Sequence, residues 1–190
     1  MQRLLLLLIA LFSLSCAEAG PDGCVGSTEA KVAVFGEGGN AGSPTIGYSY
    51  LVKTTYPDEH ACVYILPPYG TADASGRYPY RMGYKDSNDQ WVKLDGKIKT
   101  EGSKIIDNDP EYGDTVTTVL YTHLGGGCDV TLFEGQKGQS KVQGPFLELW
   151  YHSGASEESM RCCEEEFRKN LKEGTAVRKV NKNCDYGDVA

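Results

Sequence analysis

A short stretch around position 148 combines residue types that could bind an organic cation. In an extended chain Phe146, Glu148 and Trp150 share one face, because successive side chains of a strand alternate. A carboxylate between two aromatic rings can hold a cation by its charge, while the rings present π faces beside it. The alternative is a glutamate at the mouth of a barrel, flanked by two ordinary core aromatics. The pattern alone leaves both interpretations open.

The opposite face of the same strand is apolar and needs a cover. It carries Leu147, Leu149 and Tyr151, and the segment after it is the one clear helix of the sequence. We predict this helix over 155–173 and expect it to pack on the outside of the sheet, over the apolar face.

The helix prediction depends on end signals and on one stripe. Ser156 is a suitable N-cap, acidic residues follow it in the first turn, and Gly174 is expected to end the helix. Spacings of three and four residues place four apolar side chains on one side. These are Met160, Cys163, Phe167 and Leu171.

Strand signals fill the chain between 46 and 151, and turn sequences separate them. Eight short strands in series favour an up-and-down barrel or a sandwich, so the fold class is all-β with one C-terminal α-helix. The predicted strands are 46–54, 61–66, 78–84, 90–99, 104–106, 114–122, 128–133 and 143–151. Between the fifth and sixth of these, Asp107, Asp109 and Glu111 are expected to form a solvated acidic turn.

The first nineteen residues have the features of a secretory signal peptide. Arg3 precedes an unbroken apolar run over 4–12, and 17–19 is an A-x-A cleavage site. The run is too short to span a membrane. We therefore expect a secreted, extracellular protein whose residues 20–190 form one domain. It would comprise an irregular glycine-rich segment over 20–45, the sheet over 46–151, the helix, and a tail over 174–190.

Composition narrows the possible partners. The formal net charge is −7 and the basic residues are scattered, which argues against nucleic acid and anionic membranes as partners.

Six cysteines remain after the predicted cleavage, and an even count in a secreted chain indicates a disulfide framework. Adjacent Cys162 and Cys163 can bond each other only through a strained ring, so 12 of the 15 possible pairings stay open.

No catalytic constellation stands out. The chain has no nucleophile-elbow, zinc-protease or P-loop motif, and His60, His123 and His152 are scattered singly. Asp107, Asp109 and Glu111 could be imagined around calcium, but Pro110 and their spacing do not match an EF-hand loop. We therefore predict a binding protein rather than an enzyme, with no cofactor and no metal.

Four places between about 48 and 184 resemble the tick salivary lipocalins, and among them the histamine- and serotonin-binding members. These places are 50–56 with 62–63, then 91–96, then 119–122 leading to 128–130, and finally 162–167 with Cys184. The biogenic-amine signature of that family is Cys-acid-aliphatic, a gap, Glu-Leu-aromatic, a gap, and Cys. The chain supplies it as 128–130, 148–150 and Cys162. One departure is that the N-terminal segment lacks the tryptophan usual at the closed end of a lipocalin barrel.

The resemblance implies an eight-stranded antiparallel lipocalin barrel, stabilised by disulfides. It also implies how the cysteines pair, which the count alone leaves open. The implied bridges are Cys24–Cys162, Cys62–Cys184 and Cys128–Cys163.

The resemblance further implies that the protein is a monomer in saliva that binds histamine or serotonin and so suppresses host inflammation. Glu148 would be the main counter-ion, Asp129 a second carboxylate, and Trp150 and Phe146 the aromatic walls. The other candidate ligand contacts are Tyr56, Asp58, Asp95 and Tyr121.

Two other functions fit the same fold. One is a scavenger of leukotrienes or fatty acids, for which the cavity would be apolar. The other is an inhibitor that binds a host complement protein through exterior loops. The six-cysteine arrangement also resembles the complement- and leukotriene-binding members. The sequence does not distinguish these ligands, histamine from serotonin, or one site from two.

Overall fold

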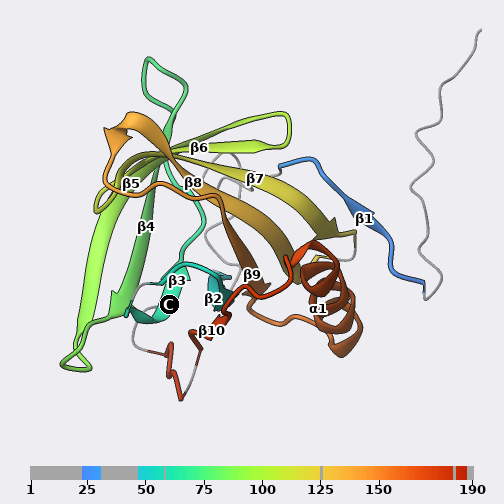
Figure 1. Ribbon diagram of the computed structural model, residues 1–190. Coiled ribbons are helices and arrows are strands. Elements are labelled where there is room, and N and C mark those ends of the chain that lie inside the picture. The colour runs from blue at the N-terminus through green and yellow to red at the C-terminus, as the bar shows by residue number, and fades with distance from the viewer. Residues whose placement is uncertain (1–22, 31–46, 58, 125, 182, 188–190) are drawn as a thin grey trace, which may run out of the picture.

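The computed structural model describes residues 23–30, 47–57, 59–124, 126–181 and 183–187. The predicted signal peptide, much of the glycine-rich segment and Asp58 lie outside these residues. Within them, eight antiparallel strands form a closed barrel (Figure 1). The strands are β2 (Ser49–Thr54), β3 (Ala61–Ile65), β4 (Tyr78–Lys85), β5 (Trp91–Glu101), β6 (Lys104–Asp109), β7 (Gly113–His123), β8 (Cys128–Ser140) and β9 (Phe146–His152).

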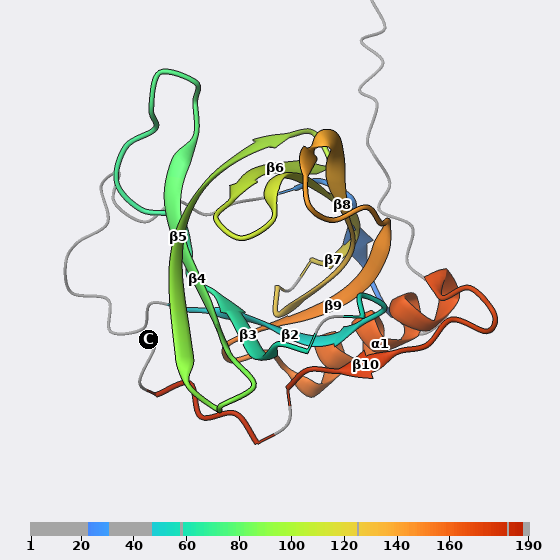
Figure 2. The same cartoon turned by 60° about the vertical axis from the view of Figure 1, so that its left-hand side comes forward.

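Each strand of the barrel pairs with its neighbour in sequence, and β9 returns to pair with β2. Figure 2 shows the strands curling into a ring. Closure leaves the eight strands without the exposed edges of an open sheet. The predicted all-β fold, an eight-stranded antiparallel barrel with one helix near its C-terminal end, is confirmed.

Two strands extend three residues or more beyond the ends that the sequence predicts. β6 continues to Asp109 rather than ending at 106, and β8 continues to Ser140 rather than ending at 133. Both extensions pair with β7, where Asp109 and Ser140 each lie opposite Gly113. The turn-forming residues around 107–110 are therefore at the very end of a hairpin, and the ladder reaches almost to the turn.

Two strands of two residues each extend the sheet beyond the barrel. β1 (Gly26–Ser27) pairs with β7, and β10 (Arg178–Lys179) pairs with β2. The sequence analysis predicts an irregular segment and a tail in these places. So short a strand has no readable alternation of its own, and its pairing depends on distant partners.

The helix α1 (Glu157–Asn170) follows β9 and lies on the outside of the barrel (Figure 1). As predicted, Ser156 is the N-cap, and its side chain accepts a hydrogen bond from the backbone N–H of Ser159. The helix ends before the predicted Gly174, because Leu171 has an extended backbone. Among the described residues, no helix is both long and apolar enough to cross a bilayer.

The largest hydrophobic cluster lies between α1 and the outer face of β8 and β9. Phe167 is only 2% exposed, and it packs with both cysteines of one disulfide. The other buried members are Val130, Leu147, Leu149 and Tyr151. The prediction that the helix covers the outer apolar face is confirmed.

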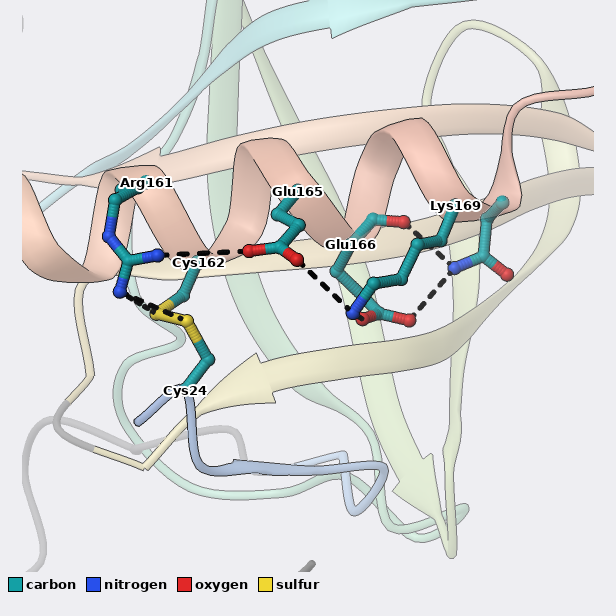
Figure 3. Close-up of polar contacts among 7 residues, drawn as sticks. Cys24, Arg161, Cys162, Glu165, Glu166 and Lys169 are labelled. Carbon is teal, nitrogen blue, oxygen red and sulfur yellow. Dashed lines mark hydrogen bonds and ion pairs between the residues drawn. A yellow bond between two sulfur atoms is a disulfide. The ribbon is translucent and has the colours of Figure 1, made fainter. Parts of the chain in front are cut away.

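Three disulfides tie the barrel to the segments around it, in the pairing that the resemblance implies. Cys128–Cys163 joins β8 to α1, and Cys62–Cys184 joins β3 to the chain after β10. Cys24–Cys162 joins the segment before β1 to α1 (Figure 3). Near this disulfide, Glu165 of α1 lies 3.7 Å from both Arg161 and Lys169.

Candidate functional site

A cavity of about 90 Å³ lies inside the barrel. This is several times the volume that one water needs, so the cavity has room for more than a single water. Its wall mixes aromatic and aliphatic side chains with four carboxylic acids and one guanidinium. The lining residues are Leu51, Tyr56, His60, Val63, Ile65, Tyr80, Met82, Tyr84, Asp107, Asp109, Glu111, Tyr112, Thr117, Phe133, Glu148, Trp150 and Arg178.

Glu148 points into this cavity from the middle of β9. It is 7% exposed, and its Oε2 accepts hydrogen bonds from Trp150 Nε1 at 2.9 Å and Thr131 Oγ1 at 3.3 Å. Burial raises the pKa of Glu148 to about 7, although these hydrogen bonds lower it and the charge of Asp109 adds to the rise. A cation in the cavity would therefore lower the pKa of this carboxyl group and favour its ionised form.

The carboxyl groups of the predicted acidic turn point into the barrel, so the expectation that they are solvated is wrong. Asp107 and Asp109 line the cavity, and Asp109 is 7% exposed. The Oδ1 atom of Asp109 accepts the backbone N–H groups of Glu111 and Tyr112, both at 2.7 Å. The backbone is thus a turn, as its composition indicates, but the barrel wall places the carboxyl groups away from water.

Asp107 is held by a fully buried tyrosine. Tyr80 Oη donates to Asp107 Oδ2 at 2.6 Å. The other oxygen, Oδ1, is buried and has no hydrogen-bond partner among the described residues. Burial raises the pKa of Asp107 to about 8, with the neighbouring Asp109 contributing to the rise. Such an acceptor is costly to bury unpaired, so it is a natural partner for a ligand N–H group.

Aromatic rings line one end of the cavity. Tyr56 packs on Phe146 with ring centroids 4.7 Å apart and on Tyr112 at 5.7 Å. Tyr112 in turn lies 6.0 Å from Phe133. Trp150 contributes a further ring beside Glu148. Phe146 supports this wall through Tyr56, whereas Tyr56 and Trp150 line the cavity directly.

The predicted second carboxylate is placed elsewhere. In the β8–β9 ladder Asp129 lies opposite Trp150, whereas Thr131 lies opposite Glu148. Its Oδ2 is 2.8 Å from His152 Nε2, and it does not line the described cavity. The Cys-acid-aliphatic half of the signature therefore does not bring its acid to Glu148.

Two other candidates point away from the interior. Asp95 is exposed, and its Oδ1 accepts from Arg81 Nε at 3.0 Å on the outer surface. Tyr121 lies opposite Val130, which belongs to the outer core, and its ring packs against β1 and the core under α1. Neither side chain lines the cavity, and Asp58 lies outside the described residues.

The sequence analysis missed Asp107, Asp109 and Arg178 as cavity residues. A longer β6 would have found the two acids, because Ile105, Asp107 and Asp109 alternate onto one face. Nothing in the sequence around Arg178 indicates an inward side chain.

The arrangement of the cavity has the chemistry to hold an organic cation. Carboxyl groups from β6 and β9 lie beside aromatic rings in a region of low dielectric constant, where charge–charge attraction is strong. In the part of the chain that the structure describes, no three side chains of His, Cys, Asp or Glu converge as metal ligands.

A closed eight-stranded barrel with an internal cavity is the architecture of a lipocalin-type ligand binder. One similar solved structure is the crystal structure of an AM182–serotonin complex. The two folds align with a TM-score of 0.55 and 28% sequence identity, over 72% of this chain and 82% of that chain. No protein-family model matches the chain, and no curated protein matches it in sequence.

Proposed function

We propose that the protein is a secreted lipocalin that binds a biogenic amine, histamine or serotonin, in the barrel cavity and sequesters it. The observation that carries the proposal is the buried Glu148, which faces the same cavity as Asp107 and Asp109. The similarity to a protein in complex with serotonin supports an amine as ligand. The three disulfides support an extracellular location, where such bonds persist.

Glu148 is the main counter-ion of the ammonium group in this proposal. An ammonium that enters the cavity favours the ionised carboxylate, and Trp150 Nε1 already donates to the oxygen that would carry the charge. Asp107 offers a second acceptor through its buried Oδ1. A fatty-acid carboxylate beside Glu148 and Asp107 would be repelled when these acids are ionised, so this part of the cavity favours an amine over an acidic lipid.

The test is a calorimetric titration with serotonin, histamine and a leukotriene. Glu148→Gln keeps the shape of the side chain and removes its charge, so amine affinity should fall by ~2–4 kcal/mol while the barrel stays folded. Asp95→Asn is the matched control, because it removes a carboxylate from the outer surface. Amine binding that survives Glu148→Gln undiminished would contradict the proposal, as would a wild-type protein that binds the leukotriene alone.

The pH dependence of affinity is a second test. With the pKa of Glu148 at about 7 in the ligand-free protein, the carboxyl group is protonated below that pH. An ammonium must then displace the proton, so amine affinity should fall as the pH decreases from 8 to 5. Titrations in buffers of different ionisation enthalpy should detect proton release upon binding. Glu148→Gln should flatten much of this dependence.

A further inference from the structure

The C-terminal strand β10 places a cationic side chain on the cavity wall. Arg178 pairs with Thr54 of β2, Thr54 pairs with Glu148 of β9, and Glu148 pairs with Thr131 of β8. Residues directly opposite each other in a ladder share a face, so all four belong to one row on the inner face of the wall. Arg178 and Glu148 are two strand spacings apart, or about 10 Å between backbones.

Backbone hydrogen bonds hold this strand within the wall. The N–H of Val180 donates to the carbonyl of Val52, and the carbonyl of Val180 accepts from the N–H of Cys62. The chain from 178 to 180 therefore lies between β2 and β3, and the Cys62–Cys184 disulfide anchors it shortly afterwards. The barrel wall therefore fixes the position of Arg178, although the sequence analysis places this residue in the C-terminal tail.

The guanidinium itself is also fixed. Arg178 Nη1 donates to the carbonyl oxygen of His60 at 2.5 Å, and both residues line the cavity. The His60 ring stacks on Tyr84 with centroids 3.6 Å apart. Glu111 also lies here, with its Oε1 3.6 Å from His60 Nε2. Arg178 is the one guanidinium among the described residues that line the cavity, and it belongs to a different part of the wall from Glu148 on β9 and Asp107 on β6.

We propose that Arg178 binds an oxygen acceptor at the end of the ligand opposite its ammonium group, so that the cavity selects amines carrying such an oxygen. This inference rests on the proposed amine function and narrows its ligand class. A guanidinium repels a second cationic group, so a ligand charged at both ends is disfavoured. A ring hydroxyl accepts from it, and a site built to bind a hydroxyl rejects the analogue lacking it.

The test compares serotonin with tryptamine, which has the same indole ring and ethylamine chain but no hydroxyl group. The wild-type protein should bind serotonin roughly tenfold more tightly, as expected for one hydrogen bond to a charged group. Arg178→Gln should reduce this ratio to below roughly threefold, chiefly by weakening serotonin. Lys179→Gln is the matched control, because the adjacent side chain is exposed, and it should leave the ratio unchanged.

Arg178→Lys provides a second variant in case Arg178→Gln does not fold. It keeps the charge but loses the planar fork, so its ratio should lie between those of wild type and Arg178→Gln. Circular dichroism of each ligand-free variant establishes that the barrel is intact. Equal binding of the two amines by wild type, or a ratio that survives both Arg178 substitutions, would overturn the role of Arg178. Failure to bind any amine would instead overturn the proposed function on which it rests.

Discussion

The two faces of β9 show how differently the two sides of this barrel wall are used. On the outer face, Leu147 and Leu149 pack beneath α1 in the largest apolar cluster. On the inner face, one residue away along the chain, Glu148 and Trp150 line a cavity with several carboxyl groups. The main hydrophobic core thus lies outside the barrel, and the polar site lies within.

This arrangement separates stability from binding. Apolar burial between the helix and the sheet adds to the stabilisation from the smaller cluster around Tyr80, Met82 and Ile98. The interior can then hold buried acids, which disfavour folding when they are ionised and unpaired. Substitutions on the two faces should therefore have distinct effects, and the following experiments test that separation in order of decreasing effect.

The largest effect is expected on the outer face. Phe167→Ala removes a buried aromatic ring from the cluster under α1, so the free energy of unfolding should fall by ~3–5 kcal/mol. Denaturant unfolding measures this loss. Arg168→Ala, at the exposed neighbouring position, should change stability by less than ~0.5 kcal/mol. Amine affinity of the folded Phe167→Ala protein should be unchanged, and a large loss of affinity would show that the two faces are coupled.

A smaller, pH-dependent effect is expected on the inner face. Burial raises the pKa of Glu148 from 4.5 to about 7, so the folded state binds this proton more tightly than the unfolded state. Its contribution to stability is present below pH 4.5 and is lost as the pH rises to about 7. A glutamine at this position does not titrate, so Glu148→Gln lacks this pH-dependent loss. The unfolding free energy of the variant minus that of wild type should therefore increase by ~2–3 kcal/mol from pH 5 to pH 8.

Denaturant unfolding of both proteins at the two pH values, without ligand, checks this result. A difference that does not change with pH would mean that Glu148 is solvated in the folded barrel. Asp107 and Asp109 remain in both proteins, so most of the contribution of their own raised pKa values cancels in the comparison.

The smallest effect is expected on the outer surface away from α1. The Arg81–Asp95 ion pair is exposed, and such pairs contribute ~0–1 kcal/mol. Asp95→Asn should therefore change stability by less than ~1 kcal/mol and leave amine affinity as it is, with isothermal titration as the measurement. A clear loss of affinity would place Asp95 in the ligand site after all, and the inner and outer faces of β5 would need to be reassigned.

Local pattern predicted much of the architecture correctly. The alternation around Glu148 and the stripe containing Phe167 both depend on the fixed geometry of strands and helices, so they could be read directly. The inward placement of Asp107 was missed, because the turn residues that follow it suggested that β6 ends at 106 and hid the alternation that continues to Asp109. Asp129 shows a further limit, since its partner in the structure is His152, a residue that no motif connects to it.

By itself, the sequence determined the fold class, the outer core beneath the helix and the inward strand face of Glu148, because each follows from the period of its element. The resemblance to a family added the cysteine pairing. Only the tertiary structure decided which acids share the cavity and that Arg178 belongs to its wall. These depend on strand register and on β10 lying between β2 and β3, and register is set by contacts among distant segments that no local pattern contains.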